Sequence, residues 1–137
     1  MHSILVKDYM QAESHAISVN ANTSDVVERL LKSGLTGIPV IDEKEAVVGF
    51  VSEQDCIKEL LNGAFFCDEP PGVRTVMATD VLTVTPTTSI VELAQTMMSQ
   101  KPKNYPVVSD GKLVGLITRR HILKALIEND EDCYLHF

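Results

Sequence analysis

The chain has 137 residues, of which 45% are hydrophobic, and a formal net charge of −7 at pH 7. This length suits a compact domain with a sizeable core, and the acidic balance argues against general nucleic-acid binding, which relies on clustered Lys and Arg. No apolar run approaches the roughly 18 residues of a membrane span. The three cysteines are widely spaced and predict neither a disulfide framework nor a zinc site. We expect a cytoplasmic protein that binds neither nucleic acid nor membrane.

The first half of the chain predicts a mixed α/β unit. Turn residues, caps and apolar periodicity divide it into elements. These are a lead-in (1–9), a strand (15–19), a helix from Asn22 to Gly34, a hairpin of strands 38–41 and 47–52, and a helix over 53–61 with Ile57, Leu60 and Leu61 facing inward.

Residues 63–75 follow as a linker. Asn62-Gly63 ends the preceding helix, and Pro70-Pro71-Gly72 excludes regular structure. Ala64, Phe65 and Phe66 are too apolar for a free linker, so we expect them to cover core or an interface.

The second half predicts the same order of elements. They are a strand (81–84), a helix from Ser89 to Gln100, a hairpin around Asp110-Gly111, and a helix from Thr118. Glu92 lies three residues after Ser89, as in a capping box. Met97 and Met98 are expected to fill the core, and the acidic C-terminal residues to be solvated.

The order recurs because the sequence contains an internal repeat. Pro39 matches Pro106, Gly49 matches Gly115, and Ser52 matches Thr118. A regular repeat takes precedence over local propensity, so we predict a first copy at 1–62, a linker at 63–75 and a second copy at 76–137. The fold class is α/β (α+β), with two pseudo-symmetric β-α-β-β-α repeats packed as one module, because either copy alone would be marginal.

The repeated motifs resemble the CBS domain, and two in tandem resemble a Bateman module. The shared elements are Leu82-Thr83-Val84-Thr85-Pro86, the Pro-Val pairs that follow Ile38 and Tyr105, and the segments Gly49–Asp55 and Gly115–His121. The resemblance covers about residues 4 to 128. It implies a regulatory sensor, not an enzyme, that needs no cofactor and holds AMP, ADP, ATP or S-adenosylmethionine in a cleft between the repeats.

The resemblance also implies the residues of that site. In the motif, a hydroxyl and a carboxylate hold phosphate and ribose, and residues beside the Pro-Val element line the adenine pocket. The corresponding candidates are Ser52, Asp55, Ile38, Pro39, Ile17, Thr118, Arg119, Arg120, His121, Thr83, Tyr105 and Pro106. A helix start suits an anion because its free N–H groups point at the ligand.

The second copy departs from this pattern at His121, where the motif has Asp. Neutral imidazole has one acceptor and cannot grip a vicinal diol as a carboxylate does. Arg119 and Arg120 instead supply two cations there. We therefore expect one nucleotide to bind both copies, with its ribose recognised by the first copy and its phosphate attracted by the second. The residues also allow purely structural roles. Ser52 and Thr118 can act as helix caps, and Asp55 can act as a first-turn acid. His121 can be a packing or surface residue, and Arg119 and Arg120 can form a solvated face.

Two other functions remain possible alternatives to a regulatory sensor. One is a ligand-free scaffold whose acidic faces dock an unknown protein partner, and the other is a small enzyme using His121, although no catalytic triad or Walker loop is present. We also expect a homodimer, because the last helix of each copy carries more apolar surface than one core needs. Its candidate contacts are Ile57, Leu60, Leu61, Ile122, Leu123, Leu126 and Ile127.

Overall fold

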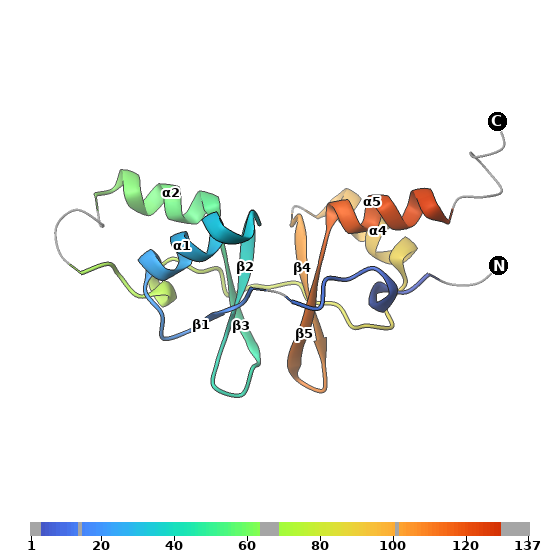
Figure 1. The fold of residues 1–137 in the computed structure, drawn as a ribbon, viewed down its shortest axis with the longest axis horizontal. Coiled ribbons are helices and arrows are strands. Elements are labelled where there is room, and N and C mark those ends of the chain that lie inside the picture. The colour runs from blue at the N-terminus through green and yellow to red at the C-terminus, as the bar shows by residue number, and fades with distance from the viewer. Residues whose placement is uncertain (1–3, 14, 64–68, 101, 130–137) are drawn as a thin grey trace. The chain divides into compact units, whose positions relative to one another are not determined.

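The computed structural model describes residues 4–13, 15–63, 69–100 and 102–129. Its elements are η1 (Val6–Asp8), β1 (Ile17–Ser18), α1 (Thr23–Ser33), β2 (Gly37–Ile41), β3 (Val47–Ser52), α2 (Glu53–Leu61), η2 (Val73–Thr75), α4 (Ile90–Ser99), β4 (Asn104–Ser109), β5 (Lys112–Thr118) and α5 (Arg119–Glu128) (Figure 1). The predicted mixed α and β fold is confirmed. The expectations for Ala64, Phe65 and Phe66, and for most of the acidic tail, lie outside the described residues.

The chain divides into two compact units. As far as they are described, Ser14–Val81 with Asp110–Leu113 form one, and Met1–Glu13, Leu82–Ser109 and Val114–Phe137 form the other. We call them the β1–β3 unit and the β4–β5 unit, after their sheets.

In the β1–β3 unit, three strands lie in the order β1-β2-β3, with β1 parallel and β3 antiparallel to β2. Helices α1 and α2 pack against each other and against this sheet. The buried core consists of Ile17, Val19, Val26, Leu30, Ile38, Val40, Val51, Cys56 and Val73.

The ends of α1 follow from the local sequence. Asn22 accepts a hydrogen bond from the backbone N–H of Asp25 at 3.0 Å, and the Asp25 carboxylate accepts from the backbone N–H of Asn22 at 3.3 Å. This reciprocal pair satisfies two amides that a helix start leaves open. Gly34 ends the helix with a φ of 72°, a conformation that glycine adopts without steric cost. Both ends confirm the prediction.

Strands β4 and β5 form the predicted hairpin, which belongs to the β4–β5 unit except for its tip, Asp110–Leu113. Asp110 and Gly111 have φ values of 53° and 78°, and positive φ at both central residues suits a two-residue hairpin turn. The core of this unit consists of Val6, Ile90, Leu93, Tyr105, Val107, Ile117, Ile122 and Ala125.

The prediction of a strand at residues 81–84 is wrong. Only Val84 pairs, in an isolated parallel bridge with Val107. The pairing ends there because Thr85 begins a turn in which its N–H donates to the Thr88 hydroxyl at 3.0 Å, while Leu82 and Thr83 are exposed. The capping box predicted for α4 is present in its first half, since the Glu92 N–H donates to Ser89 Oγ at 3.4 Å.

A segment at the start of each copy, residues 4–13 in the first copy and 76–80 in the second, pairs with the hairpin of the other copy. We call these two segments the lead-ins. Gln11 exchanges two backbone hydrogen bonds with Leu116 of β5, at 2.8 and 2.9 Å, and Ala78 exchanges two with Phe50 of β3, at 2.8 and 2.9 Å. The N-terminal turn, blue in Figure 1, lies beside α4, where the Ile90 N–H donates to the Ile4 carbonyl at 2.8 Å. Each unit is therefore completed by residues that belong to the other copy in sequence.

The inward faces predicted for two helices need correction. In α2 the buried residue is Cys56, whereas Ile57 and Leu61 are 54% and 83% exposed. In α4, Met97 packs against the core but Met98 is 88% exposed. Both helices carry more apolar residues than one face can hold, so packing against the neighbouring helix and sheet decides which of them are buried.

Candidate functional site

Ser52 and Asp55 form a closed hydrogen-bonded pair where β3 passes into α2. Ser52 is the N-cap, and Asp55 Oδ2 accepts from both the backbone N–H and the hydroxyl of Ser52, each at 2.9 Å. The Asp55 N–H donates back to Ser52 Oγ at 3.1 Å. All three bonds involve Oδ2 or the serine hydroxyl. Among the described residues no donor is recorded for Asp55 Oδ1, and the side chain is half-buried.

The apolar candidates of the same unit lie on neighbouring strands. Ile17 of β1 pairs with Val40, and Gly37 of β2 pairs with Ser52, which brings the start of β2 to the start of α2. Ile38 and Ile17 are buried in the core, and Pro39 is buried as well. The sequence candidates of the first copy are therefore spread along β2, with Ser52 beside its first residue and Ile17 near its last.

Thr118 and His121 form the corresponding junction between β5 and α5. The backbone N–H of Thr118 donates to His121 Nδ1 at 3.0 Å, and the Thr118 hydroxyl lies 3.1 Å from the same nitrogen. Because Nδ1 accepts the amide hydrogen, the neutral ring carries its proton on Nε2. His121 thus fills the capping position that Asp55 fills in the first copy.

The protonation of His121 is opposed by its surroundings. Partial burial, and then the positive charge of Lys124, lower the pKa of the imidazole below its ordinary value. The ring therefore favours the neutral form in which Nδ1 can accept a hydrogen bond.

Arg119 and Arg120 are the first two residues of α5, and both side chains are exposed. The Arg119 N–H donates to the Lys103 carbonyl at 3.0 Å, which fixes the start of the helix to the segment before β4. The first turn of α5 contains no acidic residue. The positive end of the helix dipole and two cations therefore coincide there.

The remaining candidates of the second copy lie along β4. Tyr105 and Pro106 are buried, and the Pro106 carbonyl accepts from the Val84 N–H at 3.0 Å, which places the exposed Thr83 next to this strand. The Tyr105 hydroxyl is buried with no hydrogen-bond partner among the described residues. Burial raises the pKa of this phenol.

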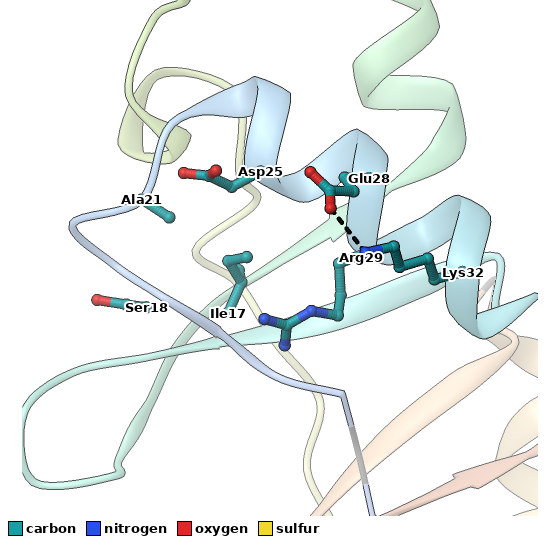
Figure 2. Close-up of a pocket in the computed structure, with 7 residues that line it drawn as sticks. All are labelled: Ile17, Ser18, Ala21, Asp25, Glu28, Arg29 and Lys32. Atoms are coloured by element: carbon teal, nitrogen blue, oxygen red, sulfur yellow. Dashed lines mark hydrogen bonds and ion pairs between the residues drawn. The ribbon is translucent and has the colours of Figure 1, made fainter.

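A cavity of about 350 Å³ lies between α1 and β1. Figure 2 shows Arg29 reaching from α1 toward β1, where its guanidinium Nη1 donates to the Ala16 carbonyl at 2.8 Å. Glu28 and Lys32 form an ion pair of 2.7 Å on its rim. Its lining residues are Ile17, Ser18, Ala21, Asp25, Glu28, Arg29 and Lys32. Among these lining residues, Ile17 is the one that the sequence analysis named as a ligand candidate. The others could not be identified from sequence, because contacts such as that between Arg29 and Ala16 have no local sequence signal.

A second cavity of about 270 Å³ contains no sequence candidate; it is lined by Val19, Asn20, Asp42, Glu43, Lys44 and Arg74. In the part of the chain that the structure describes, no cluster of three or more His, Cys, Asp or Glu could hold a metal ion. No helix of that part is long and apolar enough to cross a bilayer.

Comparison with known proteins finds the same architecture elsewhere. The structure of CBSX2 in complex with AMP superposes with a TM-score of 0.78 at 27% identity, over 92% of this chain and 98% of that one. A putative acetoin utilization protein from Vibrio cholerae superposes with a TM-score of 0.82 at 26% identity, over 95% of each chain.

An uncharacterized protein of Methanocaldococcus jannaschii is 28% identical over 88% of this chain, which spans 42% of that protein. The A-adding tRNA nucleotidyltransferase of Aquifex aeolicus is 28% identical over 92% of this chain, which spans 15% of the enzyme. The chain thus covers less than half of these curated relatives. The family description "CBS domain" matches residues 6–62 and 73–128. Together the repeat, the paired junctions and this match show that the chain belongs to the CBS domain family, with two CBS domains in tandem.

Proposed function

We propose that this chain is a cytoplasmic regulatory module, not an enzyme, that binds an adenosine nucleotide or a related ligand (AMP, ADP, ATP or S-adenosylmethionine). CBSX2, which is 27% identical over 92% of the chain, has been crystallised with AMP. The observation that carries the proposal is the open oxygen of Asp55. A carboxylate whose Oδ2 is occupied by Ser52 and whose Oδ1 has no recorded donor among the described residues can accept the hydroxyl groups of a ribose.

The two junctions differ in what they offer a ligand. Asp55 presents an acceptor oxygen, whereas His121 uses its one acceptor, Nδ1, for the Thr118 amide and keeps only the Nε2–H donor. A donor cannot receive a hydrogen bond from a ribose hydroxyl in the way a carboxylate does. We therefore assign ribose to Ser52 and Asp55.

For the β4–β5 unit by itself, we propose that Arg119 and Arg120 attract a phosphate. Both are exposed at the start of α5, whose first turn holds no acidic residue. The start of α2 contains Glu53 and Asp55 instead, which oppose an anion. Charge-assisted hydrogen bonds from guanidinium groups to phosphate are strong, and those of an exposed pair weaken with salt.

The test is calorimetry with AMP on the wild type and on Asp55→Asn. Asparagine keeps an oxygen for the Ser52 N–H but replaces the open carboxylate oxygen with an amide donor, so the helix cap survives. We expect AMP affinity to fall roughly ten- to a hundredfold, the equivalent of a lost charge-assisted bond. The matched control is Asp8→Asn, which changes the exposed capping carboxylate of η1 and should leave AMP affinity unchanged.

Thermal unfolding with a panel of AMP, ADP, ATP, S-adenosylmethionine and adenosine tests binding as such. A ligand that binds the folded state at a hundredfold excess over its Kd stabilises it by about 2.7 kcal/mol. No shift with any compound at millimolar concentration would overturn the proposal and favour a ligand-free interaction scaffold.

The scaffold remains the second candidate because each unit exposes apolar side chains on its helices. Leu31, Ile57 and Leu61 are exposed in the β1–β3 unit, and Met98, Leu123 and Ile127 in the β4–β5 unit. They occupy equivalent positions of the two copies.

Large exposed apolar patches mark interaction surfaces, and a surface that is repeated within one chain suits a second copy of that chain. We therefore propose a homodimer, with these helix faces as its interface.

A further inference from the structure

The two strand-to-helix junctions are capped by residues of different chemistry. At the start of α2 the acceptor for the N-cap amide is a carboxylate oxygen of Asp55, and at the start of α5 it is the Nδ1 nitrogen of His121. Side-chain carboxyls titrate well below neutral pH, whereas imidazole titrates close to it. The same backbone geometry is thus held by two kinds of acceptor, a carboxylate oxygen and an imidazole nitrogen, and imidazole is the kind that takes up a proton near neutral pH.

Protonation changes what His121 can do at the junction. A hydrogen on Nδ1 prevents that atom from accepting the Thr118 amide, which lies 3.0 Å away. The Thr118 hydroxyl, 3.1 Å from Nδ1, can turn to accept the new hydrogen, but the Thr118 amide is left without the ring as its acceptor. The imidazolium would also lie in the first turn of α5, at the positive end of the helix dipole.

Among the neighbouring charges, Lys124 adds to this effect. On α5 itself the charges nearest in sequence are Arg119, Arg120 and Lys124, all positive. On the elements that pack beside α5, β4 contains the titratable Tyr105 but no charged residue, and β5 has only Lys112, at its opposite end. The charged residue of α4 is Glu92, in its first turn, and the segment before β4 contributes Lys103, whose carbonyl binds Arg119.

We propose that His121 is a pH-responsive capping residue, whose protonation below neutral pH releases the Thr118 amide and loosens the β5–α5 junction while the Ser52–Asp55 junction remains closed. This inference concerns the ligand-free chain and does not depend on nucleotide binding. Of the two equivalent strand-to-helix junctions, only the one at the start of α5 would then respond to mild acid. The lowered pKa of His121 agrees with it, because the folded junction favours the neutral ring.

The experiment is nuclear magnetic resonance of the full, ligand-free chain between pH 8 and pH 5. At pH 8 the ring of His121 should show an unprotonated Nδ1 and a protonated Nε2. Between pH 8 and pH 5 the hydrogen-exchange protection factor of the Thr118 amide should fall roughly tenfold, as expected for the loss of one hydrogen bond. The Ser52 amide is the internal control, and its protection factor should change less than about twofold.

Two variants separate the capping role from a general effect of pH. His121→Asp keeps an acceptor at this position and suits the helix start, and His121→Asn keeps a neutral one. In both, Thr118 protection should no longer depend on pH. A hydrogen on Nδ1 at pH 8, a parallel fall at Thr118 and Ser52, or a wild-type response in both variants would overturn the inference.

Discussion

A Cβ atom placed on Gly49 would lie 2.5 Å from Sδ of Met77 and 3.0 Å from the carbonyl oxygen of Ala78. The equivalent Gly115 has the same relationship to the first lead-in, since its Cβ would lie 2.8 Å from the Gln11 carbonyl and 3.0 Å from Met10 Sδ. Each hairpin therefore needs a glycine where the lead-in of the other copy crosses it.

Replacing these glycines should destabilise the fold. The closest contact of the Gly49→Ala methyl group is a movable methionine, and the Ala78 backbone oxygen is 3.0 Å away, whereas the Gly115→Ala methyl group has a backbone oxygen at 2.8 Å as its closest contact. We therefore expect the larger loss for Gly115→Ala, within the roughly 1–3 kcal/mol typical of overpacking. Urea unfolding measures both. The control is Gly72→Ala, because a Cβ there would have its nearest neighbour at 4.0 Å; an equal loss in all three variants would contradict the steric account.

Tyr105→Phe should leave the protein as stable or make it more stable. The Tyr105 hydroxyl is buried without a partner among the described residues, and a buried polar group without a hydrogen bond costs roughly 1–3 kcal/mol. Thermal unfolding of this variant shows directly whether its stability rises or falls. A loss of stability would show that the hydroxyl has a partner, such as a buried water.

Tyr9→Phe is expected to lower the stability of the protein, and to do so mainly at the end of α5. The Tyr9 hydroxyl donates to Glu128 Oε1 at 3.0 Å and accepts from Asn129 Nδ2 at 2.8 Å, at the end of α5. These groups are largely solvent-accessible, so global stability should fall by less than about 1 kcal/mol. Hydrogen exchange should quicken in the last turn of α5 and stay unchanged in α2, and uniform quickening would argue against this local role.

The stability of the chain should contain a pH-dependent contribution from His121. Its pKa is lower in the folded state than in an unfolded chain, so the unfolded state binds the proton more readily. The contribution is therefore complete above about pH 6.5, the unperturbed value, and is lost as the pH falls through the folded pKa. The difference in unfolding free energy between the wild type and His121→Asn should shift against the wild type as the pH falls from 8 to 5; a constant difference would exclude such a contribution.

Oligomeric state tests the apolar helix faces. Light scattering at micromolar concentration should give about 30 kDa for a twofold dimer, against 15.1 kDa for one chain. Leu61→Glu together with Ile127→Glu should yield the monomer, because both side chains are more than half exposed in the single chain and their replacement should spare the core. Lys58→Glu, an exposed polar position on α2, is the control. A wild-type mass near 15 kDa would rule out the dimer.

Much of the fold was predictable because its signals are local. Asn22, Gly34 and Asp110-Gly111 act through their own backbone and that of near neighbours, so the ends of α1 and the β4–β5 turn could be located from sequence. The repeat also predicted that Ser52 and Thr118 would begin equivalent helices. A four-residue segment such as 81–84 needs a partner strand, and its propensity could not reveal that only Val84 would find one.

The sequence by itself determined the repeat, the order of elements and the change from Asp55 to His121, since each depends on residues close together in the chain. Tertiary structure decided that the lead-ins are exchanged, so that Gln11 pairs with Leu116 and Ala78 with Phe50. It also decided that α2 buries Cys56 and leaves Leu61 exposed. Helical periodicity allows more than one apolar face, and backbone pairing between segments far apart in the chain has no local sequence signal, so only packing between distant segments could select among the alternatives.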